Sequence, residues 1–116
     1  MKVLALIYTD PRSWETASEA EREDVGARYR AFGDRAGERI VGGAELASTK
    51  SATTVRVRDG ETFVTDGPFA ETKEELGGFY LFECSGLDEA GELVAAIPGA
   101  ERGAIELRAA YEEAAA

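Results

Sequence analysis

Two short segments of this sequence are apolar at consecutive positions rather than at every second position. The first is Val3 to Tyr8, and the second is Gly78 to Cys84. A strand with one face in water alternates apolar and polar side chains, whereas an uninterrupted apolar run is typical of a strand that is covered on both faces. We therefore expect the two segments to lie side by side in the middle of one sheet.

A helix is expected after the first strand. Ser18 and Glu21 form a capping box, whose side chains bond free backbone N–H groups at a helix start. An apolar stripe at helical spacing follows; it consists of Val25, Tyr29, Phe32 and Ala36. Because Gly37 suits the left-handed turn that ends many helices, these signals predict a helix from about Glu19 to Ala36.

The middle of the chain contains signals for three further strands. Arg39 to Leu46 includes Gly42-Gly43, which predicts a strand with a bulge or a close backbone approach. Thr53 to Arg58 and Thr62 to Thr65 flank Asp59-Gly60, a two-residue turn sequence. The segment from Thr53 to Thr65 is therefore predicted to form a half-exposed hairpin.

A second helix and a last strand are expected after the second apolar run. Ser85 or Asp88 supplies the helix start, and Pro98-Gly99 is expected to end the helix. The apolar face of this helix is predicted to consist of Leu87, Ala90, Leu93, Val94 and Ile97. Ala104 to Arg108 then closes the chain as a short strand.

The order of these elements is β-α-β, an inserted β-hairpin and again β-α-β. This is the split β-α-β arrangement of ferredoxin-like α+β domains, and 1–116 is the length of one such domain.

Two helices cover only one face of a four-stranded sheet, so the second apolar face needs another cover. A few hundred Å² of apolar surface is worth several kcal/mol at about 25 cal/mol per Å². We expect a homodimer through this face; a terminal segment such as Ala109 to Ala116 is the alternative cover.

Charge and composition argue against several classes of function. The 23 acidic and 13 basic residues give a net charge of -10, which repels nucleic-acid backbones and anionic membranes. The chain has no histidine, so zinc sites and His-based triads are excluded, and no metal or cofactor is predicted. The single cysteine, Cys84, cannot form an intrachain disulfide, which favours a cytoplasmic location.

The stretch from Val64 to Tyr80, which reads VTDGPFAETKEELGGFY, resembles the DGPF-type branch of the YCII-related family. Trp14 and the closing strand from Gly103 to Arg108 look like the same family, so the resemblance covers nearly the whole chain. It implies a ferredoxin-like domain that pairs face to face as a dimeric α/β barrel. Relatives in this wider superfamily include small-molecule lyases, dehalogenating enzymes and isomerases.

Asp66 is the candidate catalytic residue. Some YCII members have a proposed His and Asp pair, which cannot be carried over to a chain without histidine. Asp66 has two interpretations. It forms a turn with Gly67 and Pro68 by accepting hydrogen bonds from backbone N–H groups one to three residues on, or it serves as a general acid or base at the edge of an apolar cavity between sheet faces.

Several other side chains are candidate ligand contacts. Each tyrosine either packs in the core with a hydrogen-bonded hydroxyl or contacts a ligand. Trp14 is expected in a loop after Pro11, as a lid or as an anchor for that loop. Lys73 either binds an anionic ligand group or pairs with a neighbouring carboxylate, and Phe69 is a hydrophobic plug or a ligand contact. The complete predicted set is Tyr8, Trp14, Tyr29, Phe69, Lys73, Tyr80 and Arg108.

Two functions from different classes remain. In the first, the homodimer binds a small apolar or aromatic metabolite in a cavity between its subunits. It would then perform cofactor-free acid/base chemistry of the lyase or isomerase type, through Asp66 and a tyrosine hydroxyl. In the second, the chain is a non-catalytic dimeric accessory or regulatory module that acts through a protein partner. Family members that resemble partners of sigma factors suggest this alternative.

Overall fold

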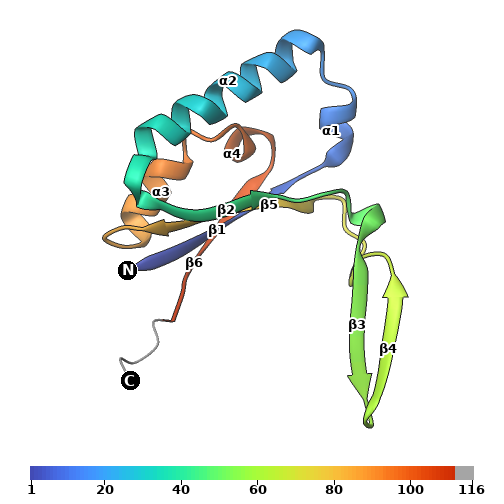
Figure 1. The fold of residues 1–116 in the computed structure, drawn as a ribbon. Helices are drawn as coiled ribbons and strands as arrows, with labels where there is room; N and C mark the ends of the chain where they lie inside the picture. Colours follow the sequence, from blue (N-terminus) through green and yellow to red (C-terminus); the bar gives the residue numbers. More distant parts are fainter. Residues whose placement is uncertain (112–116) are drawn as a thin grey trace.

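The computed structural model describes residues 1–111, which form a sheet, a layer of helices and a separate hairpin (Figure 1). The elements in chain order are β1 (Lys2–Thr9), α1 (Pro11–Glu15), α2 (Glu19–Ala36), β2 (Ile40–Glu45), β3 (Thr53–Arg58), β4 (Glu61–Asp66), β5 (Glu75–Glu83), α3 (Leu87–Val94), α4 (Pro98–Arg102) and β6 (Ala104–Ala109). Short 3-10 turns occupy Gly37–Arg39 and Thr49–Ser51.

The main sheet has four strands in the order β2-β5-β1-β6, and all neighbours are antiparallel. The two apolar runs are therefore adjacent and central, as predicted, with Val3 opposite Phe82 and Ala5 opposite Tyr80. Together with helices after β1 and β5, this strand order is that of a ferredoxin-like α+β domain.

The hydrophobic core lies between this sheet and the helices α2, α3 and α4, which all cover the same sheet face (Figure 1). Alternate residues of β1, namely Val3, Ala5 and Ile7, point into it and are at most 8% exposed. From β5, Phe82 is fully buried and its ring stacks on that of Tyr80, with centroids 5.7 Å apart. This packing orients the other alternate residues of both strands towards the opposite face.

The first long helix begins and ends where its sequence signals predicted. The Ser18 hydroxyl accepts a hydrogen bond from the backbone N–H of Glu21 at 3.1 Å, and Gly37 follows the helix with a φ of 54°. Arg28 of α2 forms a two-pronged ion pair with Glu101 of α4, at 2.9 and 2.6 Å. The pair fixes the short helix α4 against α2, although surface ion pairs of this kind add little stability.

The second helix is shorter than predicted. It ends at Val94, and Pro98 begins a further helix, α4, instead of closing the same one. Proline suits the first turn of a helix, because the N–H group that it lacks has no helical partner there. Leu87 was expected on the buried face of α3 but is 47% exposed at the helix start, whereas Leu93 is 3% exposed. The prediction for Leu87 was therefore wrong.

Trp14 was expected in a loop, and that prediction was also wrong. It lies in the short helix α1, which the sequence analysis did not anticipate. The Asp10 carboxylate caps this helix by accepting a hydrogen bond from the backbone N–H of Arg12 at 3.0 Å, and Pro11 occupies the first turn. A cap of this type followed by proline is a helix-start signal.

No helix covers the second face of the sheet within residues 1–111 (Figure 1). We call this surface the helix-free face. Its apolar side chains are half-buried in the single chain; they are Leu4, Leu6, Tyr8, Leu76, Phe79 and Leu81. Its charged side chains are balanced, with Lys2 and Arg108 against Glu83 and Glu106. It is therefore apolar at the centre and neutral in sum, in a chain whose net charge is -10.

The strands β3 and β4 pair only with each other among the described residues and form a separate two-stranded sheet. The hairpin leaves the end of the main sheet and extends past the helix-free face, on the side opposite to the helices (Figure 1). Every residue of β4 is exposed, so the hairpin is more exposed than the half-exposed hairpin that the sequence predicted.

The bulge predicted for the strand with Gly42-Gly43 is present, and a second one lies in β5. The register of β2 shifts between Ile40 and Gly42, and the register of β1 against β5 shifts opposite Gly77. At Gly43, whose φ is 159°, an added Cβ would lie 2.7 Å from the carbonyl oxygen of Phe79. Side chains larger than hydrogen are excluded there, because the backbones of β2 and β5 approach each other closely.

The predicted alternative cover, Ala109 to Ala116, is placed only in part. Ala109 is the last residue of β6, and residues 112–116 lie outside the described part of the chain.

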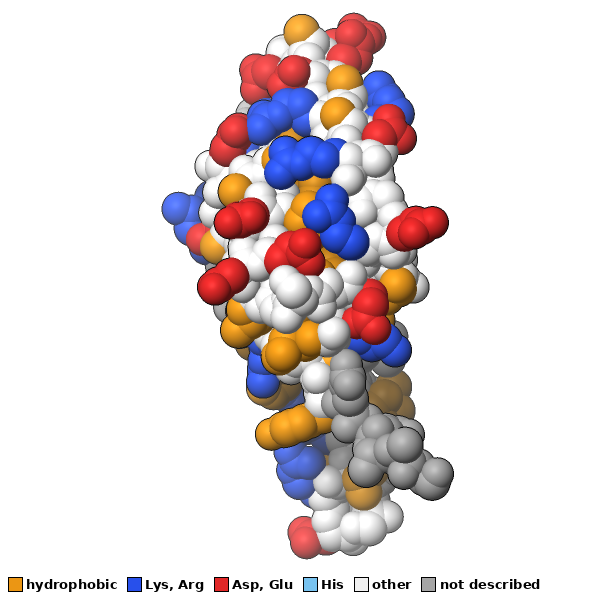
Figure 2. Space-filling model, turned by 90° about the vertical axis from the view of Figure 1, so that its left-hand side faces the viewer, with side chains coloured by type: hydrophobic (Ala, Val, Ile, Leu, Met, Phe, Trp, Pro, Cys, Tyr) orange, Lys and Arg blue, Asp and Glu red, His pale blue; other side chains and the backbone are white. Residues whose placement is uncertain are grey.

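None of the helices in the described part is both long and apolar enough to cross a membrane. Seen from the side of α3, the helical layer shows acidic and basic side chains intermixed, and hydrophobic side chains gather below it (Figure 2).

Candidate functional site

Tyr29 and Tyr80 lie on the helix-covered side of the sheet. The ring of Tyr80 packs against Phe32, with centroids 5.2 Å apart, and Tyr29 packs against the same core from α2. Burial raises the pKa of both phenols above the ordinary value of 10.0. For Tyr29, a hydrogen bond with the Gly99 backbone acts in the opposite direction, and the nearby Tyr80 raises the pKa further. Both side chains are thus half-buried and pack against the core in the single chain.

The shifted tyrosines predict a late component in an alkaline titration. Because the folded-state pKa values are raised, the two neutral phenols contribute stability below pH 10, and this contribution is lost as pH rises through the folded pKa values. We expect the ultraviolet absorbance of tyrosinate to show residues that ionise above pH 10 in the folded protein and near pH 10 in denaturant. Stability should fall over the same alkaline range.

Replacing both core tyrosines by phenylalanine identifies the late component. The variant Tyr29→Phe/Tyr80→Phe should lose the late absorbance step. A late step of unchanged size in this variant would mean that the two phenols are not the ones that burial protects.

Tyr8 and Arg108 lie on the helix-free face. Tyr8 is opposite Leu76 of β5 and Ala104 of β6, and Arg108 is opposite Leu4. Both side chains therefore border the apolar centre of this face, with Arg108 exposed and Tyr8 half-buried. The sequence analysis missed Glu106, which borders the same face opposite Leu6. The two-residue period of β6, which places Glu106 and Arg108 on one face, could have identified it.

Asp66 is the last residue of β4 and is exposed, at the end of the hairpin that joins the body. Gly67 has the expected positive φ, 98°, and its carbonyl oxygen accepts a hydrogen bond from the Thr54 hydroxyl at 2.8 Å. Within residues 1–111, no hydrogen bond joins the Asp66 carboxylate to the backbone N–H groups that follow it. The turn is thus held by the backbone and Thr54 instead of by Asp66.

Phe69 and Lys73 follow the hairpin and are both exposed. Phe69 is 79% exposed, and the guanidinium of Arg56 lies over its ring at 5.7 Å from the centroid. Lys73 lies near Asp10. The pKa of Asp10 is lowered mainly by the side-chain hydrogen bond from Arg12, and the charge of Lys73 adds a smaller effect in the same direction. Lys73 is therefore close to a carboxylate of its own chain.

Trp14 contacts the long helix. The Arg22 guanidinium lies over the indole ring at 5.3 Å from the centroid and donates a hydrogen bond to the Trp14 carbonyl oxygen at 3.0 Å. Cation–π contacts at exposed sites are worth about 0.5–1 kcal/mol. In the single chain, these contacts hold α1 against α2, as expected for an anchor.

The predicted residues thus fall into separate groups. Tyr29 and Tyr80 pack against the core, Trp14 contacts α2, Lys73 lies near Asp10, and the remaining four border the helix-free side of the molecule. The last group comes from two places: the helix-free face supplies Tyr8 and Arg108, and the base of the hairpin supplies Asp66 and Phe69. Figure 1 shows that these two surfaces meet at an angle and border a common open space.

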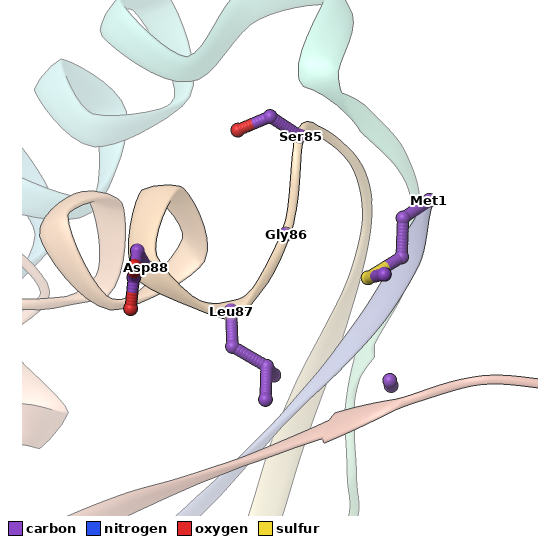
Figure 3. A pocket seen from close by; sticks show the side chains of 6 residues that line it. Met1, Ser85, Gly86, Leu87 and Asp88 are labelled. Atoms are coloured by element: carbon purple, nitrogen blue, oxygen red, sulfur yellow. The ribbon is translucent and has the colours of Figure 1, made fainter.

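Two surface hollows of the single chain lie elsewhere. One, of about 340 Å³, is lined by Met1, Ser85, Gly86, Leu87, Asp88 and Ala109. Figure 3 shows that Leu87 and Met1 enter it from opposite sides, whereas the Ser85 hydroxyl points away. A second hollow is a groove along the exposed surface of α2. Neither contains a predicted site residue. In the described residues, no three His, Cys, Asp or Glu side chains are grouped to hold a metal ion.

Comparison with known families gives a match over almost the entire chain. The profile of the YCII-related domain matches residues 1–113. Part of the chain is also 62% identical, over 47 residues, to an uncharacterised protein of Rhizobium meliloti (strain 1021). This second match covers 40% of the chain and 38% of that protein, so it spans well under half of the relative's length.

The solved structures with a similar fold include 5-chloro-2-hydroxyhydroquinone dehydrochlorinase from Burkholderia phenoliruptrix AC1100, in complex with 2,5-dihydroxybenzoquinone. The TM-score is 0.59, and the alignment covers 96% of this chain and 94% of that chain. Sequence identity is 18%, so the likeness concerns the fold.

Proposed function

Since the chain belongs to the YCII-related domain family, we propose that it works as a homodimer that binds a small apolar or aromatic molecule between its subunits. The observation that carries this proposal is the helix-free face. Six half-buried apolar side chains on adjacent strands form an apolar surface that water contacts in the single chain. A second copy of the same face is the economical cover, because a twofold axis makes one surface complement itself.

The chemistry of the surrounding side chains indicates a class of ligand. Leu4, Leu6 and Phe79 supply flat apolar contact, which suits an aromatic or quinone-like ring. Arg108 supplies a cation for an acidic group on such a ring, and the Tyr8 hydroxyl supplies a hydrogen-bond donor. The dehydrochlorinase of similar fold was solved with 2,5-dihydroxybenzoquinone, a ligand of this size and type.

Asp66 is the proposed general acid and base of the DGPF-type motif. In an isomerisation or elimination, its carboxylate would take a proton from an acidic C–H or O–H bond of the ligand and return it at another atom or to the leaving group. The Tyr8 hydroxyl would donate a hydrogen bond to the oxygen on which negative charge develops. These steps need no cofactor, and the proposal places the dimer in the cytoplasm, where the single thiol of Cys84 stays reduced.

Thermal denaturation against a panel of small aromatic acids, lactones and central metabolites tests this proposal. A ligand that binds only the folded state stabilises it by about 2.7 kcal/mol at a concentration of 100 Kd. We expect saturable stabilisation of the wild type, weaker stabilisation of Asp66→Asn and the wild-type response in Asp34→Asn. The last variant makes the same change at an exposed position of α2.

A hit from this panel then allows an activity test. Turnover by the wild type should have a bell-shaped pH profile that is lost in Asp66→Asn. If no compound stabilises either protein while both are folded and dimeric, the small-molecule proposal is wrong. The alternative, a non-catalytic dimeric accessory module, would then be favoured by the exposed apolar side chain of Phe69.

A further inference from the structure

The hairpin of β3 and β4, residues 53–66, is a regular and locally encoded structure; we call it the hairpin arm. Its register is unbroken from Thr53 opposite Asp66 to Arg58 opposite Glu61. Asp59 and Gly60 connect the strands with φ values of 52° and 76°. Positive φ at both central residues is typical of the type I′ turn, which matches the twist of the flanking strands. The arm is therefore a defined element instead of an irregular loop.

The arm carries apolar side chains that no other part of residues 1–111 covers. Val55, Val57 and Val64 lie on one face of the ribbon and are 60%, 57% and 63% exposed. The opposite face carries Arg56 and Arg58, together with polar or aromatic neighbours. Two-stranded hairpins are marginally stable in water and need a further layer on their apolar face. The valine face of the arm is therefore the face that requires a partner surface.

The shape of the chain supports this requirement. The radius of gyration of the Cα atoms is 16.5 Å, against about 13 Å for a compact domain of this length. The principal extents are 48 × 47 × 17 Å. The molecule is therefore thin in one direction and broad in the two directions along which the body and the arm extend (Figure 1). The space inside this angle is bordered by the helix-free face and by the arm (Figure 1).

The area of the helix-free face indicates what fills this space. With strands about 4.8 Å apart and a rise of about 3.3 Å per residue, four strands of the length of β1 have a footprint of about 500 Å². A standard interface buries about 800 Å² on each partner. One face of the arm, with two strands of six residues each, adds about 200 Å² and brings the interface close to that standard.

We propose that the arm clasps the second copy of the chain, with Val55, Val57 and Val64 against the body of the partner subunit. This inference rests on the proposed homodimer and adds a second contact region to it. In a twofold dimer each body fills the angle of the other, and both arms are covered. The base of each arm, where Asp66 lies, then borders the space between the two sheet faces, so that arm docking and closure of the ligand space occur together.

The first test measures the dimer dissociation constant of Val55→Thr/Val57→Thr/Val64→Thr by sedimentation equilibrium. Threonine keeps the branched shape and the strand propensity of valine but replaces one methyl group by a hydroxyl. We expect the dissociation constant to be at least tenfold higher than that of the wild type, because apolar burial at three positions is lost. Arg58→Gln, on the opposite face of the arm, should leave the constant within twofold.

The second test does not depend on the folding of a triple variant. In a Cys84→Ala background, Val57→Cys places a thiol on the valine face, and Arg58→Cys places one on the other face of the same strand. We expect the Val57→Cys thiol to resist an alkylating reagent at protein concentrations where the dimer forms and to react rapidly after dilution. The Arg58→Cys thiol should react at the same rate in both conditions.

The outcomes separate this inference from the proposed dimer. A dimeric wild type with an unchanged dissociation constant in the triple variant, or an equally reactive Val57→Cys thiol at both concentrations, would overturn the clasping arm and leave the sheet-face dimer standing. A monomeric wild type at all concentrations would overturn both.

Discussion

Leu6→Glu is expected to leave the protein folded but monomeric. Leu6 lies at the centre of the helix-free face, opposite Phe79 of β5 and Glu106 of β6. In the proposed dimer, the new carboxylate would be removed from water beside the acidic Glu106, at a cost of several kcal/mol. A loss of about 4 kcal/mol raises the dissociation constant about a thousandfold. Size-exclusion chromatography with light scattering should report the monomer mass of 12.4 kDa.

Ala31→Glu provides the matched control for this prediction. Ala31 lies on the exposed surface of α2, so the variant acquires the same charge far from the helix-free face. We expect it to remain dimeric, with a free energy of unfolding close to that of the wild type. If Leu6→Glu has the same mass as Ala31→Glu, the helix-free face is not the contact between subunits.

Leu93→Ala is expected to lower the free energy of unfolding by about 2–5 kcal/mol, the usual range for a truncated core leucine. Leu93 is 3% exposed and belongs to the cluster of α3, β1 and β5 residues that fills the space above the sheet. The truncation removes apolar contacts and leaves a cavity, since the surrounding strands cannot collapse into it. Urea denaturation followed by circular dichroism measures the loss.

The same helix provides a comparison for this prediction. Leu87 is 47% exposed at the start of α3, so Leu87→Ala should cost under about 1 kcal/mol. Both variants remove the same atoms from the same helix, and the difference between them isolates the effect of burial. Equal losses would show that Leu93 is not a core residue.

Much of the fold could be predicted because local signals and long-range packing agree. The apolar run of Val3 to Tyr8 and the run around Phe82 indicated two central strands, and the structure pairs them directly. The turn sequence Asp59-Gly60 specified the hairpin, since both residues adopt the positive φ that few other residues tolerate. Ser18 and Gly37 fixed the ends of α2 for similar local reasons.

The errors concern short elements, for which sequence signals are weakest. Pro98 was interpreted as a helix end, but proline is equally suited to a helix start, and only its position after the turn at Ala96 decides between them. Helix α1 has one turn of five residues and depends on the Asp10 cap. Such short helices have little intrinsic stability and form because the flanking structure positions them.

The candidate site could be predicted only in part, because its geometry depends on distant segments and on a second copy of the chain. Residue type alone could not separate Tyr8 from Tyr80, yet the register places them on opposite faces of the sheet. Likewise, nothing near Asp66 in the sequence indicated that the hairpin extends away from the body (Figure 1). The catalytic role of Asp66 stays a prediction, which the Asp66→Asn experiments address.

Sedimentation equilibrium of the wild-type protein over a range of micromolar concentrations tests the central claim most directly. The proposed pairing through the helix-free face predicts a mass of 24.8 kDa, twice the 12.4 kDa of the chain. The excess over the monomer mass should disappear on dilution and in Leu6→Glu. A mass of 12.4 kDa across the whole range would contradict the account, since the apolar sheet face would then be exposed to water in the working protein.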